Sequence, residues 1–302
     1  MIINTSKITT EGQNKKTINI DTVTTLEALI LINNEDKQVP TAIKKALPQI
    51  AKTVDKAYEV IKNGGRVIYI GAGTSGRIGV LDASEVVPTF GTDDNTIIGI
   101  IAGGDKALRE AIEGVEDSKE AALQDLINYR LTNKDLVIAI AASGRTPYAI
   151  GAVEYAKSIN AKTACITTSG DSVLAAIVDF PIEAITGPEA LTGSTRMKSG
   201  TAQKLICNMI STVTMIKLGK AYRNLMVDVK MSNAKLIARA TNIVIEITGA
   251  SKEDAYNAVV KYNSAKKAIF SIVTGINDLK IIDEELTKAN GKLRDALQNN
   301  IK

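Results

Sequence analysis

The stretch RVIYIGAGTSGRIG, residues 66–79, decides the fold, because an apolar run leads directly into a glycine-rich turn. The run at 66–70 is typical of a buried strand. Gly71, Gly73 and Gly76 match the G-x-G-x-x-G spacing of a turn that opens a helix beside a phosphate. The segment predicts a strand, a turn and a helix, and it leaves open whether the turn holds a dinucleotide or another phosphate.

Four more apolar runs follow this segment and alternate with helical patterns, at residues 96–101, 135–141, 162–167 and 180–185. Continuous runs rich in Val and Ile that alternate with helices indicate parallel strands buried on both faces. We therefore expect an α/β fold with a doubly wound, five-stranded parallel sheet in the middle of the chain.

Helical patterns flank the predicted sheet on both sides. Residues 24–33 and 40–63 are expected to form N-terminal helices, and apolar residues at helical spacing from Ala202 to Ile216 predict a long helix. Shorter helical patterns fill the remainder and predict a small C-terminal helical appendage. The predicted parts are an N-terminal helical segment at 1–50, an α/β domain at 51–225 and a C-terminal helical domain at 226–302.

The composition excludes several classes of partner. No apolar stretch reaches the ~20 residues that a membrane-spanning helix needs. The net charge of +4 comes from 37 basic and 33 acidic residues spread along the chain, without the basic blocks or interleaved aromatic residues that bind nucleic acid. We expect no membrane and no nucleic acid as partner. The N-terminus lacks a secretory signal pattern, so a cytoplasmic location is expected.

The chain contains no histidine, which removes the usual general base and the commonest metal ligand together. The two cysteines, Cys165 and Cys207, fall in a strand-like and a helical pattern, which favours buried thiols over a disulfide. Proton transfer must use Glu, Asp, Lys or Tyr, and no metal site is expected.

A dinucleotide site requires an acidic residue ~20 positions after the glycines, at the end of the second strand, to bind the ribose. Thr96 begins that strand here, and the nearest acidic candidate, Asp105, lies 29 residues beyond Gly76. The dinucleotide interpretation is therefore weakened.

Two loops at predicted helix starts carry hydroxyl groups and glycine: Gly73, Thr74 and Ser75 after the first strand, and Ser143, Gly144 and Thr146 after the third. Free N–H groups at a helix start and short hydroxyl donors together suit a phosphate monoester. Each loop alone is explained equally well by ordinary helix capping, and Pro147 suits any first helical turn. Two such loops at carboxyl ends of strands in one sheet favour a shared ligand site.

A third polar cluster, residues 192–201, precedes the long helix. Ser194 and Lys198 in it are candidate substrate-binding residues, and Lys198 and Arg196 could meet an anion. The alternative is that these are ordinary basic residues on the surface.

Two glutamates lie where helices are expected to break. Glu85 comes shortly before Pro88 and Gly91, and Glu116 precedes Asp117, which resembles a capping box with Glu120. Most glutamates in such places are solvated and inert, and catalysis is the alternative.

A geometric difficulty accompanies Glu85. On a straight helix it would lie ~13 Å along the axis from Gly76, further than a small sugar spans. Either the helix ends early, or the loop of another subunit supplies part of the site.

Segments around all these residues resemble the N-acetylmuramic acid 6-phosphate etherase family. The resembling segments are 69–77, 81–91, 101–104, 113–118, 141–148 and 193–204, together with 10–14, 32–37 and 224–228. The likeness runs nearly from end to end. It implies a sugar isomerase (SIS) domain that binds phosphosugars, here at 51–225, and a homodimer.

The resemblance also implies the reaction: the D-lactyl ether of N-acetylmuramic acid 6-phosphate is cleaved with water to N-acetylglucosamine 6-phosphate and D-lactate, without cofactor or metal. The catalytic acids of the family fall on Glu85 and Glu116, and its phosphate loop falls on Ser143, Gly144 and Thr146. In an elimination followed by hydration, we expect Glu85 to protonate the departing lactate and Glu116 to act as the second acid–base group. Which glutamate is acid and which is base remains open.

Two other functions fit the same fold. The etherases also resemble the glucokinase regulatory protein, which senses a phosphosugar without turnover, although that protein is longer and carries two such domains. An aldose–ketose isomerase would convert a phosphosugar without releasing lactate. Release of lactate distinguishes the etherase from both alternatives.

Overall fold

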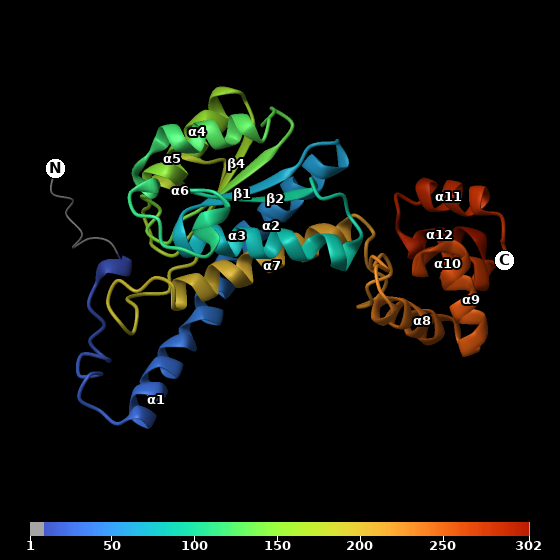
Figure 1. Ribbon diagram of the computed structural model, residues 1–302, viewed down its shortest axis with the longest axis horizontal. Helices are drawn as coiled ribbons and strands as arrows, with labels where there is room; N and C mark the ends of the chain where they lie inside the picture. Colours follow the sequence, from blue (N-terminus) through green and yellow to red (C-terminus); the bar gives the residue numbers. More distant parts are fainter. Residues whose placement is uncertain (1–8, 302) are drawn as a thin grey trace. The chain divides into compact units, whose positions relative to one another are not determined.

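The computed structural model describes residues 9–301 of the chain (Figure 1). These residues divide into two compact units. The first takes the residues up to Ser84 together with Asn95–Ser211, and the second takes Glu85–Asp94 together with the residues from Thr212 onward.

The first unit is built on a parallel sheet of five strands in the order β2-β1-β3-β4-β5. The strands are β1 (Val67–Gly71), β2 (Ile97–Ile101), β3 (Leu136–Ile140), β4 (Lys162–Thr167) and β5 (Phe180–Glu183). The chain starts at β1, moves to the edge strand β2, and then crosses to β3 on the other side. The strand order thus reverses between β1 and β3, the place where open α/β sheets bind ligands. The predicted five-stranded α/β fold is confirmed.

Helices cover both faces of this sheet (Figure 1). The helices on one face are α4 (Lys119–Asn128), α5 (Pro147–Ser158) and the short α6 (Val173–Ile177), whose apolar side chains share a core with β1 and β3. The helices on the other face are α2 (Gln38–Lys62), α3 (Gly73–Phe90) and α7 (Lys198–Lys217). Because side chains alternate along a strand, both faces of β1 and β3 are fully buried, as their apolar sequences predict.

The N-terminal part begins with a 3-10 turn, η2 (Thr9–Glu11), and the helix α1 (Thr25–Asp36), which leads into α2. Thr24 caps α1 and forms a capping box with Glu27. The helix leaves large apolar side chains in solvent: Leu26 is 67% exposed and Leu29 is 59% exposed. Much of the apolar surface of α1 is therefore uncovered within residues 9–301.

Helix α3 ends at the second of the two break residues that the sequence suggests after Glu85, not at the first. It continues through Pro88 to Phe90 and ends at Gly91, whose φ of +58° is left-handed and whose N–H donates to the Val87 carbonyl at 2.9 Å. A proline this near the end removes only one hydrogen bond of the last turns, so glycine rather than proline stops the helix.

The second unit has its own apolar core, formed by a bundle of five short helices with the segment before it. The helices are α8 (Ala234–Thr248), α9 (Lys252–Tyr262), α10 (Ala265–Thr274), α11 (Leu279–Lys288) and α12 (Leu293–Asn300). The buried Lys266 side chain donates to the carboxylate of Asp228 and to the carbonyls of Gly219 and Gly291, so it ties the segment before the bundle to the turn between α11 and α12. The predicted C-terminal helical appendage is confirmed. Over residues 9–301, no helix has the length and apolar character needed to cross a membrane.

A buried carboxylate locks the starts of β1 and β3 together. Asp135 accepts hydrogen bonds from the backbone N–H and guanidinium of Arg66 at 2.8–3.2 Å, and from the N–H and hydroxyl of Thr132. Burial alone would raise the pKa of Asp135, but these hydrogen bonds and the Arg66 charge outweigh it and hold the pKa below its ordinary value.

Asp135→Asn is expected to lower the free energy of unfolding by about 3 kcal/mol at pH 7, because it removes the charged partner of a largely buried guanidinium. The stabilisation from a depressed carboxyl pKa is complete above the unfolded value of about 3.9 and is lost as the pH falls through the folded value. Urea unfolding at pH 7, 5 and 3 should therefore show the difference between wild type and variant shrinking toward pH 3. Glu154→Gln, which breaks the exposed pair with Lys119, is the control and should change stability little. A pH-independent difference for Asp135→Asn would contradict this account.

Candidate active site

The turn between β1 and α3 packs so closely against the surrounding backbone that a side chain would not fit at two of its glycines. A Cβ on Gly71 would lie 2.7 Å from the Ile140 carbonyl oxygen, and one on Gly76 would lie 2.5 Å from the Gly71 carbonyl oxygen. Gly73 differs: it is exposed, has open space around it, and adopts a φ of +53° at the start of α3. Two of the three glycines thus pack the turn, and only Gly73 faces solvent.

The first turn of α3 packs against the first turns of α7. A Cβ on Gly200 would lie 3.3 Å from the methyl carbon of Thr74, and the buried Ser75 hydroxyl donates to Gln203 Oε1 at 3.0 Å. The structure therefore brings the first predicted loop and the third predicted cluster together.

The second predicted loop follows β3, the neighbour of β1 in the sheet. Gly144 has a φ of +64°, and a Cβ there would lie 2.4 Å from Ser172 Cβ, so only glycine fits. Ser143 Oγ accepts from the Arg145 N–H at 3.2 Å. Thr146 is the N-cap residue of α5, yet its side chain makes no capping hydrogen bond.

The N-terminus of α5 is consequently open. Across residues 9–301, neither the Ser143 nor the Thr146 hydroxyl donates a hydrogen bond, and the N–H groups of the first turn have no acceptor within the helix. Hydroxyl donors, free N–H groups and the positive end of the helix dipole all favour an anion at this point.

The N-terminus of α7 is closed by contrast. The buried carboxylate of Glu189 accepts the N–H groups of Lys198 and Ser199, both at 2.9 Å. The buried Lys198 ammonium pairs with Glu35 at 2.6 Å. Burial alone would raise the pKa of Glu35, but the hydrogen bonds from Lys198 and Asn14 and the charges of Lys198 and Lys16 together outweigh it and hold the pKa below its ordinary value.

Sequence reasoning missed both carboxylates that surround Lys198. Glu35 belongs to the segment 32–37 and Glu189 to the run before the third cluster, and no local pattern marks either as a partner of Lys198. Ser194 lies half-buried in the turn before α7, where its N–H donates to the Leu191 carbonyl. In this structure the charge of Lys198 is therefore matched within the protein.

Glu116 lies exposed on the 3-10 turn η4 (Val115–Asp117), in the connection after β2. The turn contacts α5, the helix that the second loop opens. Arg77 on α3 donates to the carbonyls of Leu108 and Glu110 at 3.1 and 3.0 Å and so ties this connection to α3. Glu116 thus stands on a turn that contacts α5, in a connection that Arg77 ties to α3.

The expected capping box at Asp117 is wrong by one residue. Ser118 caps α4, with its hydroxyl oxygen accepting the Ala121 N–H at 3.0 Å, and Glu120 instead accepts from the Ser118 hydroxyl. Serine in extended backbone can reach the N–H three residues on, which leaves Glu116 and Asp117 outside the helix.

Glu85 is exposed on α3, nine residues after Gly76 on the uninterrupted helix, a rise of about 13 Å. The possibility that the helix ends early is therefore removed. One turn before Glu85, the buried Asp82 accepts from Asn208 Nδ2 at 2.6 Å and from the Ser211 hydroxyl at 3.1 Å, which fastens α3 to α7. Burial raises the pKa of Asp82 despite these hydrogen bonds.

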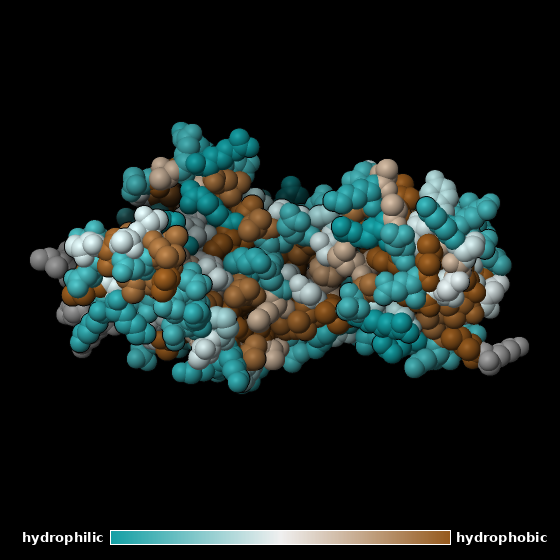
Figure 2. All heavy atoms as spheres, turned by 90° about the horizontal axis from the view of Figure 1, so that it is seen from below, coloured by the Kyte–Doolittle hydropathy of each residue, from teal (hydrophilic) through white to brown (hydrophobic). Residues whose placement is uncertain are grey.

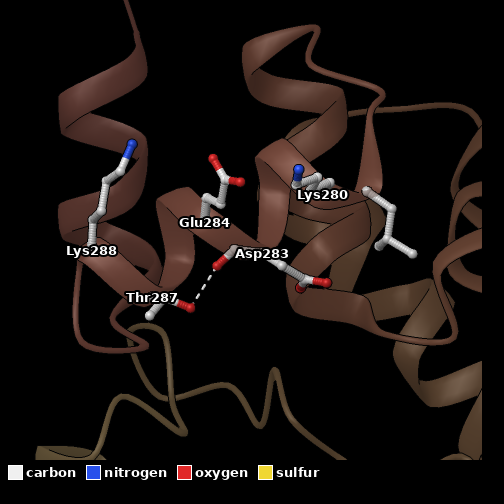
Figure 3. A pocket seen from close by; sticks show the side chains of 6 residues that line it. Lys280, Asp283, Glu284, Thr287 and Lys288 are labelled. Atoms are coloured by element: carbon white, nitrogen blue, oxygen red, sulfur yellow. Dashed lines mark hydrogen bonds between the residues drawn. The ribbon is translucent and has the colours of Figure 1, made fainter.

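The surface also has hollows outside these loops. Figure 3 shows one on α11, lined by Leu279, Lys280, Asp283, Glu284, Thr287 and Lys288. All these side chains come from one helix, and the Thr287 hydroxyl donates to the carbonyl of Asp283. No group of three or more His, Cys, Asp or Glu side chains within residues 9–301 is placed to hold a metal ion.

Comparison with known proteins gives close relatives over nearly the whole chain. The N-acetylmuramic acid 6-phosphate etherase of Vibrio atlanticus (strain LGP32) is 51% identical over 98% of this chain and 96% of that protein. The enzyme of the same name from Lactococcus lactis subsp. lactis (strain IL1403) is 55% identical over 84% of this chain and 86% of that protein.

Family profiles and a solved structure support the fold. The matching profiles are the glucokinase regulatory protein N-terminal SIS domain at 49–157, the SIS domain at 112–213 and the C-terminal lid domain of glucokinase regulatory protein at 223–279. A Bacteroides fragilis protein assigned as a phosphosugar isomerase involved in capsule formation has a TM-score of 0.51 at 20% identity, covering 67% of this chain and 95% of that one. With near full-length relatives at half identity, the chain belongs to the N-acetylmuramic acid 6-phosphate etherase family, as its sequence motifs predict.

Proposed function

We propose that this chain cleaves the D-lactyl ether of N-acetylmuramic acid 6-phosphate with water, giving N-acetylglucosamine 6-phosphate and D-lactate. Near full-length similarity to etherases supports the reaction. The observation that carries the site is the open N-terminus of α5, with two hydroxyl groups that donate no hydrogen bond within residues 9–301, at the reversal of strand order.

The substrate phosphate is proposed to bind in the loop of Ser143, Gly144 and Thr146, where donors face it and no carboxylate competes. Gly73, Thr74 and Ser75 form the neighbouring wall, and Ser194 and Lys198 complete the polar surroundings. All of these residues lie in the proposed phosphosugar-binding domain, 51–225, between the N-terminal helical segment (1–50) and the C-terminal helical domain (226–302).

The chemistry needs two carboxyl groups and no histidine. With the sugar ring open, the proton on carbon 2 is acidic because it is alpha to the aldehyde. One carboxylate removes it, the carbon 3–oxygen bond breaks, and the second carboxyl group protonates the departing lactate oxygen. Water then adds across the new double bond, with hydroxyl to carbon 3 and a proton to carbon 2. We assign lactate protonation to Glu85 and the second acid–base role to Glu116.

Purified protein should release D-lactate from N-acetylmuramic acid 6-phosphate without added metal or nucleotide. Glu85→Gln and Glu116→Gln should each lower kcat by about 10²- to 10⁴-fold, the usual contribution of a positioned acid or base. Enzymatic detection of D-lactate measures both effects.

Glu113→Gln is the matched control, because it makes the same change on an exposed glutamate three residues before Glu116 and should leave kcat unchanged. Near-full activity of both glutamine variants would refute the site assignment while sparing the reaction. Sugar phosphate binding without any lactate would instead support a regulator, whose domain profiles the chain also matches.

Thr146→Val should raise KM by about 10- to 100-fold with little change in kcat, because it removes a hydrogen bond to a charged group made equally in the ground and transition states. The Thr146 side chain caps nothing, so the melting temperature should not fall. Thr287→Val on the surface of α11 is the control. An unchanged KM for Thr146→Val would place the phosphate elsewhere.

We also propose that the protein works as a cytoplasmic homodimer. The exposed Leu26 and Leu29 on α1 support a second copy as the cover for this helix. Figure 2, seen from the side on which α1 lies, shows hydrophobic atoms open to solvent among hydrophilic ones. Two buried, free cysteines, Cys165 and Cys207, suit a reducing compartment.

The uninterrupted α3 favours a site shared between subunits, with Glu85 acting beside the loops of its partner. A heterodimer of Glu85→Gln and Glu116→Gln chains would then hold one intact site and one doubly defective site. Random mixing by co-expression should restore about a quarter of wild-type lactate release. If the mixed dimers form, with the size of the wild-type dimer, but restore no lactate release, each chain builds its own site.

A further inference from the structure

We propose that Gln203 is a positioning residue that fixes the direction of the Ser75 hydroxyl, so that Ser75 accepts a hydrogen bond from the sugar and gives none to the phosphate. The inference rests on the proposed function and deepens it, because it assigns the two hydroxyl loops to different parts of one substrate.

The geometry at Ser75 decides whether its hydroxyl can donate or only accept a further hydrogen bond. Its hydroxyl donates to Gln203 Oε1 at 3.0 Å, and both side chains are buried, Gln203 with only 1% of its surface exposed. A serine hydroxyl has a single proton and two lone pairs. With the proton committed to Gln203, the oxygen of Ser75 presents lone pairs only.

The second loop has the opposite polarity. Ser143 Oγ accepts the Arg145 N–H, which leaves its proton free, and the Thr146 hydroxyl is not used as a cap. A phosphate dianion offers acceptors only, so it pairs with this loop and not with Ser75. Sugar hydroxyls and the acetamido N–H are donors, which is what the lone pairs of Ser75 can bind. The substrate is thus oriented by the polarity of the two loops.

The buried Gln203 side chain leaves a polar group without a hydrogen bond, which costs stability and which packing alone does not explain. Its Nε2 atom is buried and has no partner within the described chain, and the same holds for the Ser199 hydroxyl one turn earlier on α7. Thr74 and Gly200 already pack the two helices together at this level. Retaining a buried amide with an unpaired N–H there is typical of a position kept for function rather than for stability.

The test compares Ser75→Ala, Gln203→Met, the double variant and Gln203→Glu, with dissociation constants for N-acetylglucosamine 6-phosphate and for inorganic phosphate and with kcat and KM for lactate release. We expect Ser75→Ala and Gln203→Met each to weaken sugar phosphate binding about fivefold to tenfold, the value of one hydrogen bond, and to leave inorganic phosphate binding unchanged. The double variant should bind sugar phosphate no more weakly than the weaker-binding single variant, because both substitutions remove the same Ser75–Gln203 hydrogen bond. Gln203→Glu keeps an oxygen facing Ser75 and should bind within about twofold of wild type.

Multiplying effects in the double variant, or an equal loss of inorganic phosphate binding, would overturn the inference. If Gln203→Met does not fold, Ser75→Ala alone decides, because loss of inorganic phosphate binding in that variant would show that Ser75 donates to phosphate. The binding measurements stand even if wild type releases no lactate, an outcome that would reject the proposed function alone.

Discussion

The turn from β1 into α3 has no room for a side chain, and the rest of the site depends on that constraint. The backbone at Gly71 presses against the end of β3, and Gly76 folds back onto Gly71. Any side chain there would push α3 away from the sheet. Because β1 and β3 are paired, the two loops leave neighbouring strands at the same edge of the sheet, and each loop carries hydroxyl groups.

The helix N-termini of the first unit differ in whether the protein itself supplies an acceptor for their free N–H groups. At the N-terminus of α7, the Glu189 carboxylate accepts the free N–H groups. At the N-terminus of α4, the neutral hydroxyl oxygen of Ser118 accepts one. At α5 the residue in the capping position, Thr146, leaves the terminus unsatisfied. Leaving those donors open costs stability that a capping side chain would return. The uncapped helix start therefore lies where the strand order reverses, which is why we propose the phosphate there.

Sequence patterns predict the helices and strands of this protein well, but they predict poorly which residues far apart in the sequence form hydrogen bonds and ion pairs. The five strands follow from continuous apolar runs, and the helix starts at the two glycine- and hydroxyl-bearing loops follow from their residues, because both signals are local. Lys198 shows the limit: its ammonium pairs with Glu35, 163 positions away, which no periodicity reveals. Of the two residues that suggest a break after Glu85, Gly91 stops α3 and Pro88 does not, because a proline so near a helix end removes too little hydrogen bonding.

The same long-range partnerships explain why the family resemblance extends to residues 10–14, far from any chemistry. Asn14 donates to the Pro188 carbonyl at 3.2 Å, and the Thr17 hydroxyl donates to the Ala190 carbonyl at 2.7 Å. These contacts clamp the residues on either side of Glu189, the carboxylate that caps α7. Because α7 also carries Gln203, which accepts from Ser75, the N-terminal segment helps to hold the helix that packs on the first loop. The segments that resemble the etherases thus include residues that support the candidate site from elsewhere in the sequence.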